Sequence, residues 1–350
     1  SLTNLRAPQG NFRTKADLNV ADAVSLFSLP VKSTGNANFE GDIAVNFAGG
    51  FDYSVTGKTA ARGLAYSYDR LNIENATAIA TVDAKPTGVT LRDVRATALG
   101  AKFSGQVELA GSDGGPPAIH AGGTVEGLEV RQAAAVLTDR PIPWNGVLSG
   151  TFDASAVPGK PLTKLNTEIA IAPLNEDMPI EGRVDLTYDQ QNSRLSFGES
   201  HVNTHATSVS VTGTLDQNLS VRGRTTSIND ILTALSMTGD AAPKTLPLQF
   251  RQGGEITVAG TLTGKLADPA FHGEISVSNA TVEDRHFDRA TSDVSAARGR
   301  VELRRMTVSR GQTQITGAVT ATANNGDFAT GQLTAQLSVR NAPLVEAARE

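Results

Sequence analysis

The residues able to act as acids, bases, nucleophiles or metal ligands are few and scattered along this chain of 350 residues. Of its five histidines, only His201 and His205 lie close together in sequence. At a spacing of four they would share one face of a helix and could bind a metal ion together. The surrounding sequence predicts strands instead, in which ~3.3 Å per residue would separate the two rings by roughly 13 Å. We therefore expect both histidines to be exposed or in turns.

Other candidates for catalysis are equally isolated. The acidic pairs Glu176-Asp177 and Glu283-Asp284 are predicted to be loop charges, because neighbouring strand residues point to opposite faces. The glycine-rich segment 111–117 lacks the Lys and the following helix of a phosphate-binding loop, and it is predicted to be a turn. No cysteine is present. We predict a protein that is not an enzyme and that uses no metal ion or cofactor.

Composition narrows the possible partners. With 31 Lys and Arg against 36 Asp and Glu, the net charge of −5 gives no basic surface for nucleic-acid phosphates. Hydrophobic residues make up 39% of the chain, but aromatic residues only 5%. This mixture favours many short strands and thin sheets over cores built around aromatic side chains. No nucleic acid is expected as a partner.

The elements that must position any site are strands, because apolar and polar residues alternate over most of the sequence. Turn residues separate the alternating segments at short intervals, which favours antiparallel hairpins. The apolar residues of these alternating segments are Ile43, Val45, Phe47, Val89, Leu91, Phe103, Val107, Ile169, Ile171, Val184, Leu186, Leu195, Phe197, Val209, Val211, Ile256, Val258, Ile275, Val277, Val301, Leu303, Ile315, Leu337 and Val339.

Short segments with helical spacing interrupt the alternation. Asn19 precedes the first and Ser227 the third, and both residue types are favourable N-caps. The predicted helices span Val20–Leu29, Val130–Leu137, Ile228–Leu235 and Leu344–Ala348.

An internal repeat is indicated by glycines. Gly41, Gly150 and Gly260 each close a short opening block and follow one another at nearly equal intervals. A second set, Gly105, Gly213 and Gly317, recurs at similar intervals. Such self-similarity is typical of repeat proteins. We predict the tail of one repeat over 1–30 and complete repeats over 31–138, 139–238 and 239–350, cut from a longer array.

The apolar side of these strands requires a cover, which is either a second layer or a ligand. Aromatic residues are too scarce for sandwich cores, and the helices are too few to cover a sheet. The sequence therefore predicts one elongated, curved, antiparallel all-β repeat sheet with short helices, whose apolar face forms a groove. The apolar residues of the alternating segments named above are predicted to line this groove. Because exposing an acyl chain costs ~0.8 kcal/mol per CH₂, or about 13 kcal/mol for 16 carbons, such a groove suits lipid tails.

Two stretches carry a family resemblance. One is Gly254–Pro269 leading into Phe271–Val277, and the other is the strand-to-helix segment Leu219–Leu232. In them the chain resembles the AsmA-like superfamily, and most of all its TamB-type repeats. The resemblance implies a taco-shaped hydrophobic groove in the periplasm of a Gram-negative envelope, with the full-length protein anchored in the inner membrane. It also implies transport of phospholipid or another acyl lipid between the membranes, and an outer-membrane barrel protein as a partner.

Two other functions remain open. The sheet could serve as a scaffold that adds strands to outer-membrane proteins during assembly. It could also be a surface rod or adhesin built as a β-helix or as tandem sandwiches, with closed and dry cores. The lipid identity, the direction of transport and the strand faces that point inward are not set by the sequence, since a register slip of one residue inverts a face.

Overall fold

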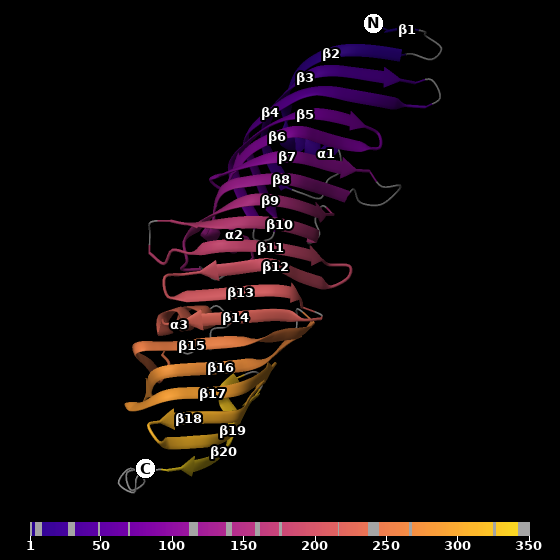
Figure 1. Ribbon diagram of the computed structural model, residues 1–350. Coiled ribbons are helices and arrows are strands. Elements are labelled where there is room, and N and C mark those ends of the chain that lie inside the picture. Colours follow the sequence, from indigo (N-terminus) through magenta and orange to yellow (C-terminus); the bar gives the residue numbers. More distant parts are fainter. Residues whose placement is uncertain are drawn as a thin grey trace. The chain divides into compact units, whose positions relative to one another are not determined.

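A computed structural model of the protein describes residues 2–3, 9–26, 32–47, 50–68, 71–111, 118–137, 142–157, 162–174, 177–215, 217–236, 245–265, 268–324 and 327–341. These residues form 20 strands and three short helices (Figure 1). Every strand pairing with a defined register is antiparallel. The predicted antiparallel all-β class is confirmed.

The chain divides into two compact units, described separately below. The first comprises Ser1–Asp177 and Thr187–Asn192. From β1 to β10 each strand pairs with the next along the chain. Its strands are β1 (Leu2–Thr3), β2 (Gln9–Asn19), β3 (Lys32–Asn46), β4 (Asp52–Tyr68), β5 (Leu71–Lys85), β6 (Gly88–Ala98), β7 (Ala101–Ala110), β8 (Ala118–Glu129), β9 (Gly146–Ala156) and β10 (Leu162–Pro173).

The second unit comprises Met178–Leu186 and Ser193–Glu350. From β12 to β20 each strand again pairs with its successor. Its strands are β11 (Glu181–Asp189, whose last three residues cluster with the first unit), β12 (Arg194–Asn203), β13 (Thr207–Thr214), β14 (Leu219–Thr225), β15 (Leu248–Lys265), β16 (Asp268–Val282), β17 (Arg285–Ala297), β18 (Arg300–Arg310), β19 (Thr313–Asn324) and β20 (Asp327–Arg340).

Three of the predicted helices are present: α1 (Val20–Leu26), α2 (Val130–Leu137) and α3 (Ile228–Ser236). The predicted caps are confirmed, because the side-chain oxygens of Asn19 and Ser227 accept hydrogen bonds from the backbone N–H groups of Ala21 and Asp230. Residues 27–29 and the helix predicted over Leu344–Ala348 lie outside the described residues.

Antiparallel register joins the alternation of one strand to that of the next. In the first unit, Phe12 faces Ile43, which faces Val55, and the row continues over nine strands without a polar residue. The adjacent row is polar or charged on every strand. The apolar row is completed by Ala84, Val89, Leu109, Ile119, Ala156 and Leu162, and the polar row consists of Arg13, Asp42, Thr56, Asp83, Thr90, Glu108, His120, Ser155 and Lys164.

The second unit has the same two-sided organisation over seven strands. Its apolar row begins at Leu219 on β14, and its polar row begins at the next residue, Ser220. The apolar row continues through Leu262, Phe271, Ala296, Val301, Ala321 and Leu333, and the polar row through Thr261, His272, Ser295, Glu302, Thr320 and Thr334. Each unit therefore has one apolar and one polar face.

A β-bulge recurs at a fixed interval. It shifts the register between Leu91 and Val94 on β6, between Phe197 and Ser200 on β12, and between Leu303 and Met306 on β18. The first residues of these three bulges are equally spaced along the chain, at positions 91, 197 and 303. Because a bulge inserts one residue, two residues three apart in sequence, such as Leu91 and Val94, remain on the same face of the sheet. The boundaries of the predicted repeats themselves remain a prediction.

Glycines of the apolar face let adjacent strands approach closely. A Cβ atom on Gly123 would lie 2.0 Å from the backbone oxygen of Ser104, and one on Gly105 would lie 2.1 Å from that of Gly122. The repeat glycines Gly150 and Gly317 have the same restriction, with a backbone oxygen of the next strand at 2.0 Å. The glycine spacing seen in the sequence thus marks positions where a side chain does not fit.

We expect Gly123→Ala to destabilise the fold by about 1–3 kcal/mol, because the added methyl group must displace the backbone of β7. The matched control is Gly122→Ala on the opposite face, where the nearest atom is the Asp153 carboxylate oxygen at 3.4 Å. Urea denaturation followed by circular dichroism measures both. Equal losses of stability in the two variants would contradict this account of the glycine.

Candidate functional site

The residues predicted to line a groove lie on the apolar faces of the two units. In the first unit, pairing places Ile43, Val45, Val89, Leu91, Phe103, Val107, Ile169 and Ile171 on one face. In the second, it places Phe197, Val209, Val211, Ile256, Val258, Ile275, Val277, Val301, Leu303, Ile315, Leu337 and Val339 on one face. That these faces bind a ligand remains a prediction.

The remaining four predicted residues do not take part in the strand pairings cited above for the two faces. Phe47 follows the end of β3 and is 49% exposed, with its ring centroid 5.3 Å from that of Phe51. It therefore does not extend the strand row as the alternation suggested. Leu195 accepts a backbone hydrogen bond from Leu215 at 2.9 Å. Val184 and Leu186 are half-buried on β11.

The apolar faces are neither closed nor fully exposed. Among the residues predicted to line the groove, Ile171 is buried, Phe47, Val209, Leu337 and Val339 are exposed, and the others are half-buried. The described part of the chain thus leaves apolar sheet surface available.

Helices cover only part of this surface. The helix α1 contacts β2 and β3, α2 contacts β8 and β9, and α3 contacts β14 and β15. Val125 on β8 and Leu219 on β14 are buried, at 6% and 4% exposure. Neither residue was selected from the sequence, although both occupy apolar positions of their strands. The helices therefore contact only a few strands of each unit.

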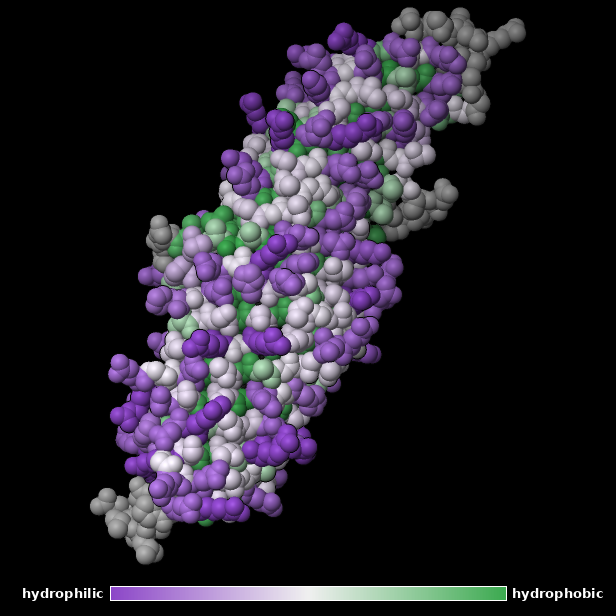
Figure 2. Space-filling view, in the orientation of Figure 1, coloured by the Kyte–Doolittle hydropathy of each residue, from purple (hydrophilic) through white to green (hydrophobic). Residues whose placement is uncertain are grey.

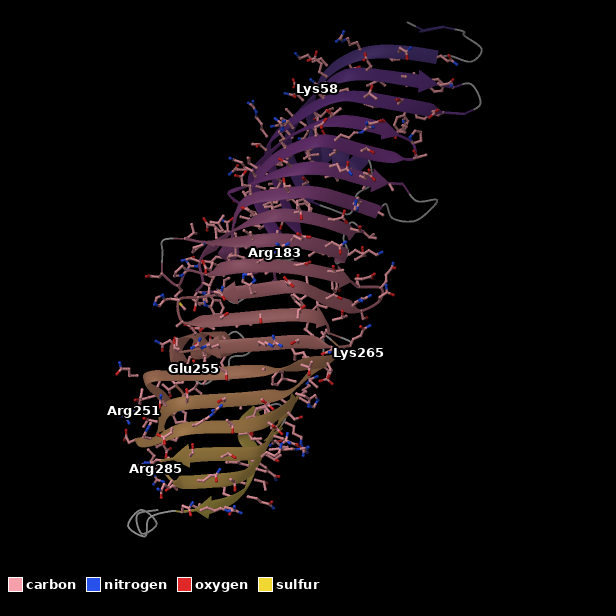
Figure 3. The ribbon with its side chains drawn as sticks, viewed as in Figure 1. Lys58, Arg183, Arg251, Glu255, Lys265 and Arg285 are labelled. Atoms are coloured by element: carbon pink, nitrogen blue, oxygen red, sulfur yellow. The ribbon has the colours of Figure 1, made fainter. Side chains whose placement is uncertain are left out.

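The opposite faces are hydrophilic. The face turned to the viewer in Figure 2 is mostly hydrophilic, and hydrophobic residues appear there as small, separate patches. Figure 3 labels Lys58 on β4 and Glu255 on β15, which belong to polar rows. Glu255 accepts a hydrogen bond from Arg224 Nε at 2.7 Å. Charged and hydroxyl side chains of this kind keep one side of a thin sheet in water.

One electrostatic cluster of the polar face lies on β18. Glu302 accepts hydrogen bonds from Arg300, at 2.6 Å, and from Arg304. Its side chain is only 12% exposed, while the two arginines are mostly exposed. The bonds from Arg300, and then those from Arg304, hold the pKa of Glu302 below its usual value, against the opposing effect of burial. This arrangement stabilises the ionised form of the Glu302 carboxylate.

In the part of the chain that the structure describes, the candidate catalytic residues lie apart from one another. His201, on the polar face of β12, and His205, in the turn before β13, are both exposed, as expected. Glu283 and Asp284 form the turn between β16 and β17, also as expected. Among the described residues, no group of three or more histidine and acidic side chains is placed to hold a metal ion. Glu176 and most of the segment 111–117 lie outside the described residues.

No protein-family model, no curated protein and no solved structure matches this chain. In the part of the chain that the structure describes, none of the helices combines the length and apolar character needed to cross a bilayer. The candidate site is therefore defined by the two apolar faces alone.

The lowered pKa of Glu302 predicts a pH-dependent contribution to stability. Because the folded-state pKa lies below the ordinary value of 4.5, the ionised carboxylate stabilises the fold above about pH 4.5, and this is lost as the pH falls through the folded-state pKa. Glu302→Gln should thus lower the urea midpoint at pH 7 but have progressively less effect below about pH 4.5. The control is Glu274→Gln, on the same face of β16. A deficit for Glu302→Gln that persists unchanged to pH 2 would contradict this.

Proposed function

We propose that this chain is a segment of a lipid conduit in a bacterial cell envelope, as its resemblance to TamB-type repeats implies. The apolar faces hold the acyl chains of phospholipid or another acyl lipid, while the head groups stay in water. The observation that supports the proposal is the continuous apolar row on each unit, nine strands long in the first and seven in the second.

The chemistry of these rows suits sliding better than fixed binding. Their members are Leu, Ile, Val, Ala and Phe, with a pairing partner every ~4.8 Å along the row. These two rows contain no polar residue, so a lipid tail that follows them loses little when it moves from one strand to the next. Half-buried side chains also have apolar area left to contribute, at about 25 cal/mol per Å². The proposal places the protein in the periplasm, with the membranes as donor and acceptor of lipid.

A charge on the apolar face should block lipid movement. We expect Ile275→Glu to reduce transfer of a fluorescent phospholipid between vesicles, and to reduce lipid that co-purifies with the protein, by about tenfold or more, because burying an unpaired carboxylate is costly. Ser276→Glu is the matched control, since it adds the same charge to the polar face of the same strand. Equal transfer by the wild type and the Ile275→Glu variant, with both folded, would reject the conduit.

A scaffold that adds strands to outer-membrane proteins is the second candidate, and one strand favours it. Within the described residues β20 pairs only with β19. Their register is unbroken between the pair Gln332–Thr322 and the pair Arg340–Gln314. Residues 332–340 are all exposed, including Leu333 at 73% and Leu337 at 57%. From residue 328 to 339 the strand carries no charge or proline, the usual protection of an edge. A strand of this composition can pair with a further extended segment, of a client protein or of the same polypeptide, by β-augmentation.

Charges on this edge should separate the two candidates. Thr334→Lys with Gln336→Lys is expected to abolish any ability of the protein to delay aggregation of an unfolded outer-membrane barrel protein, measured by light scattering, and to leave lipid transfer unchanged. The same substitutions at Thr316 and Thr320, on the interior strand β19, form the control. A scaffold function is contradicted if the β20 double variant delays aggregation as well as the wild type.

A further inference from the structure

The helix α3 begins over the apolar face of the second unit. Its Asp230 accepts a hydrogen bond from Thr207 Oγ1, with 2.5 Å between the oxygens. Thr207 pairs with Thr225, which pairs with Ile256, and all three belong to the apolar face by register. The Thr207 and Thr225 hydroxyls are also 2.7 Å apart. The side chain of Asp230 thus attaches the helix to the face on which acyl chains are proposed to lie.

Asp230 is the centre of a hydrogen-bond cluster. In addition to Thr207, its carboxylate accepts bonds from Thr204 Oγ1 at 2.7 Å and from Ser227 Oγ at 3.1 Å. These donors come from strand β13, from the turn before it and from the helix N-cap. The backbone N–H of Asp230 in turn donates to Ser227 Oγ at 3.1 Å. One carboxylate therefore joins α3 to two other parts of the second unit by charge-assisted bonds.

The remainder of α3 is held weakly. The helix has nine residues and none of them is buried. Its apolar residues, Ile228, Ile231, Leu232 and Leu235, are half-buried. Helices shorter than about 12 residues are marginal in water, so α3 depends on its contacts with β14 and β15 and on the Asp230 cluster. An apolar ligand on the same strands would compete for the contacts but not for the hydrogen bonds.

We propose that α3 is a movable partition on the apolar face of the second unit, and that Asp230 is the positioning residue that holds it in place. This inference rests on the proposed function. An acyl chain that advances past β14 and β15 displaces the apolar side of α3, because both bind the same surface. The hydrogen bonds of Asp230 set the free energy of that displacement and return the helix when the lipid has passed.

The first test compares Asp230→Ala with the wild type and with Asn229→Ala, which removes an exposed side chain from the same helix. Hydrogen exchange measured by mass spectrometry is expected to be about tenfold or more faster over residues 228–236 in Asp230→Ala, since loss of the cluster favours local opening. Uptake of a fluorescent 16-carbon fatty acid should be faster in the same variant. Neither quantity should change in Asn229→Ala. Unchanged exchange in Asp230→Ala would overturn the inference.

The second test restricts the helix. Because the chain contains no cysteine, Thr207→Cys with Asp230→Cys creates the only thiol pair, and its oxidation ties α3 to β13. The oxidised protein is expected to take up the fatty acid several-fold more slowly than the same protein after reduction. Equal uptake in the two states, with the disulfide verified by mass, would overturn the partition but not the conduit. If neither the wild type nor the variant takes up the fatty acid, the proposed conduit function is rejected. The hydrogen-exchange measurement then decides by itself whether Asp230 holds α3.

Discussion

The register of antiparallel pairing is the constraint that organises both units. Alternation within a strand shows only that one side of that strand is apolar and the other polar. Pairing of Phe12 with Ile43, and of Ile43 with Val55, extends that difference across strands, so that rows of side chains become faces. A shift of one residue at any pairing would exchange the two faces beyond it. The equally spaced bulges on β6, β12 and β18 are therefore part of the same constraint, since each displaces the register by a set amount.

A sheet that keeps one face apolar without a complete second layer has an energetic cost, and the composition reduces it. Aromatic side chains would expose the largest areas, and they make up only 5% of the chain. Where Phe39 occurs, it is 7% exposed, and its ring lies where Cβ atoms on Gly41 and Gly57 would be. Small residues thus provide space for the few large ones. The remaining apolar area is distributed as half-buried Val, Ile, Leu and Ala, which a lipid could cover further.

The polar residues have different roles in the two faces. On the polar face, ion pairs such as Arg224 with Glu255 are partly exposed and individually contribute little to stability. The Asp230 cluster is different, because it lies among apolar-face positions and connects a helix to a strand. The N-cap role of Ser227 could be recognised from the sequence, since Ser precedes the helix and an acidic residue follows three positions later. The contributions of Thr204 and Thr207 could not, because these residues belong to a turn and a strand that are distant from Asp230 along the chain.

Local patterns in the sequence were enough to predict the strand class, the positions of α2 and α3, and the apolar side of each separate strand. These features follow from alternation, capping residues and turn residues within a few positions. The sequence also marked the glycines at repeating intervals, without the reason for them. The three-dimensional arrangement was needed to learn that the apolar sides coincide, that the glycines stand where the next backbone leaves no space, and that α3 is attached to the apolar face through Asp230. Each of these depends on pairing between distant residues, and a single sequence contains no record of which strands become neighbours.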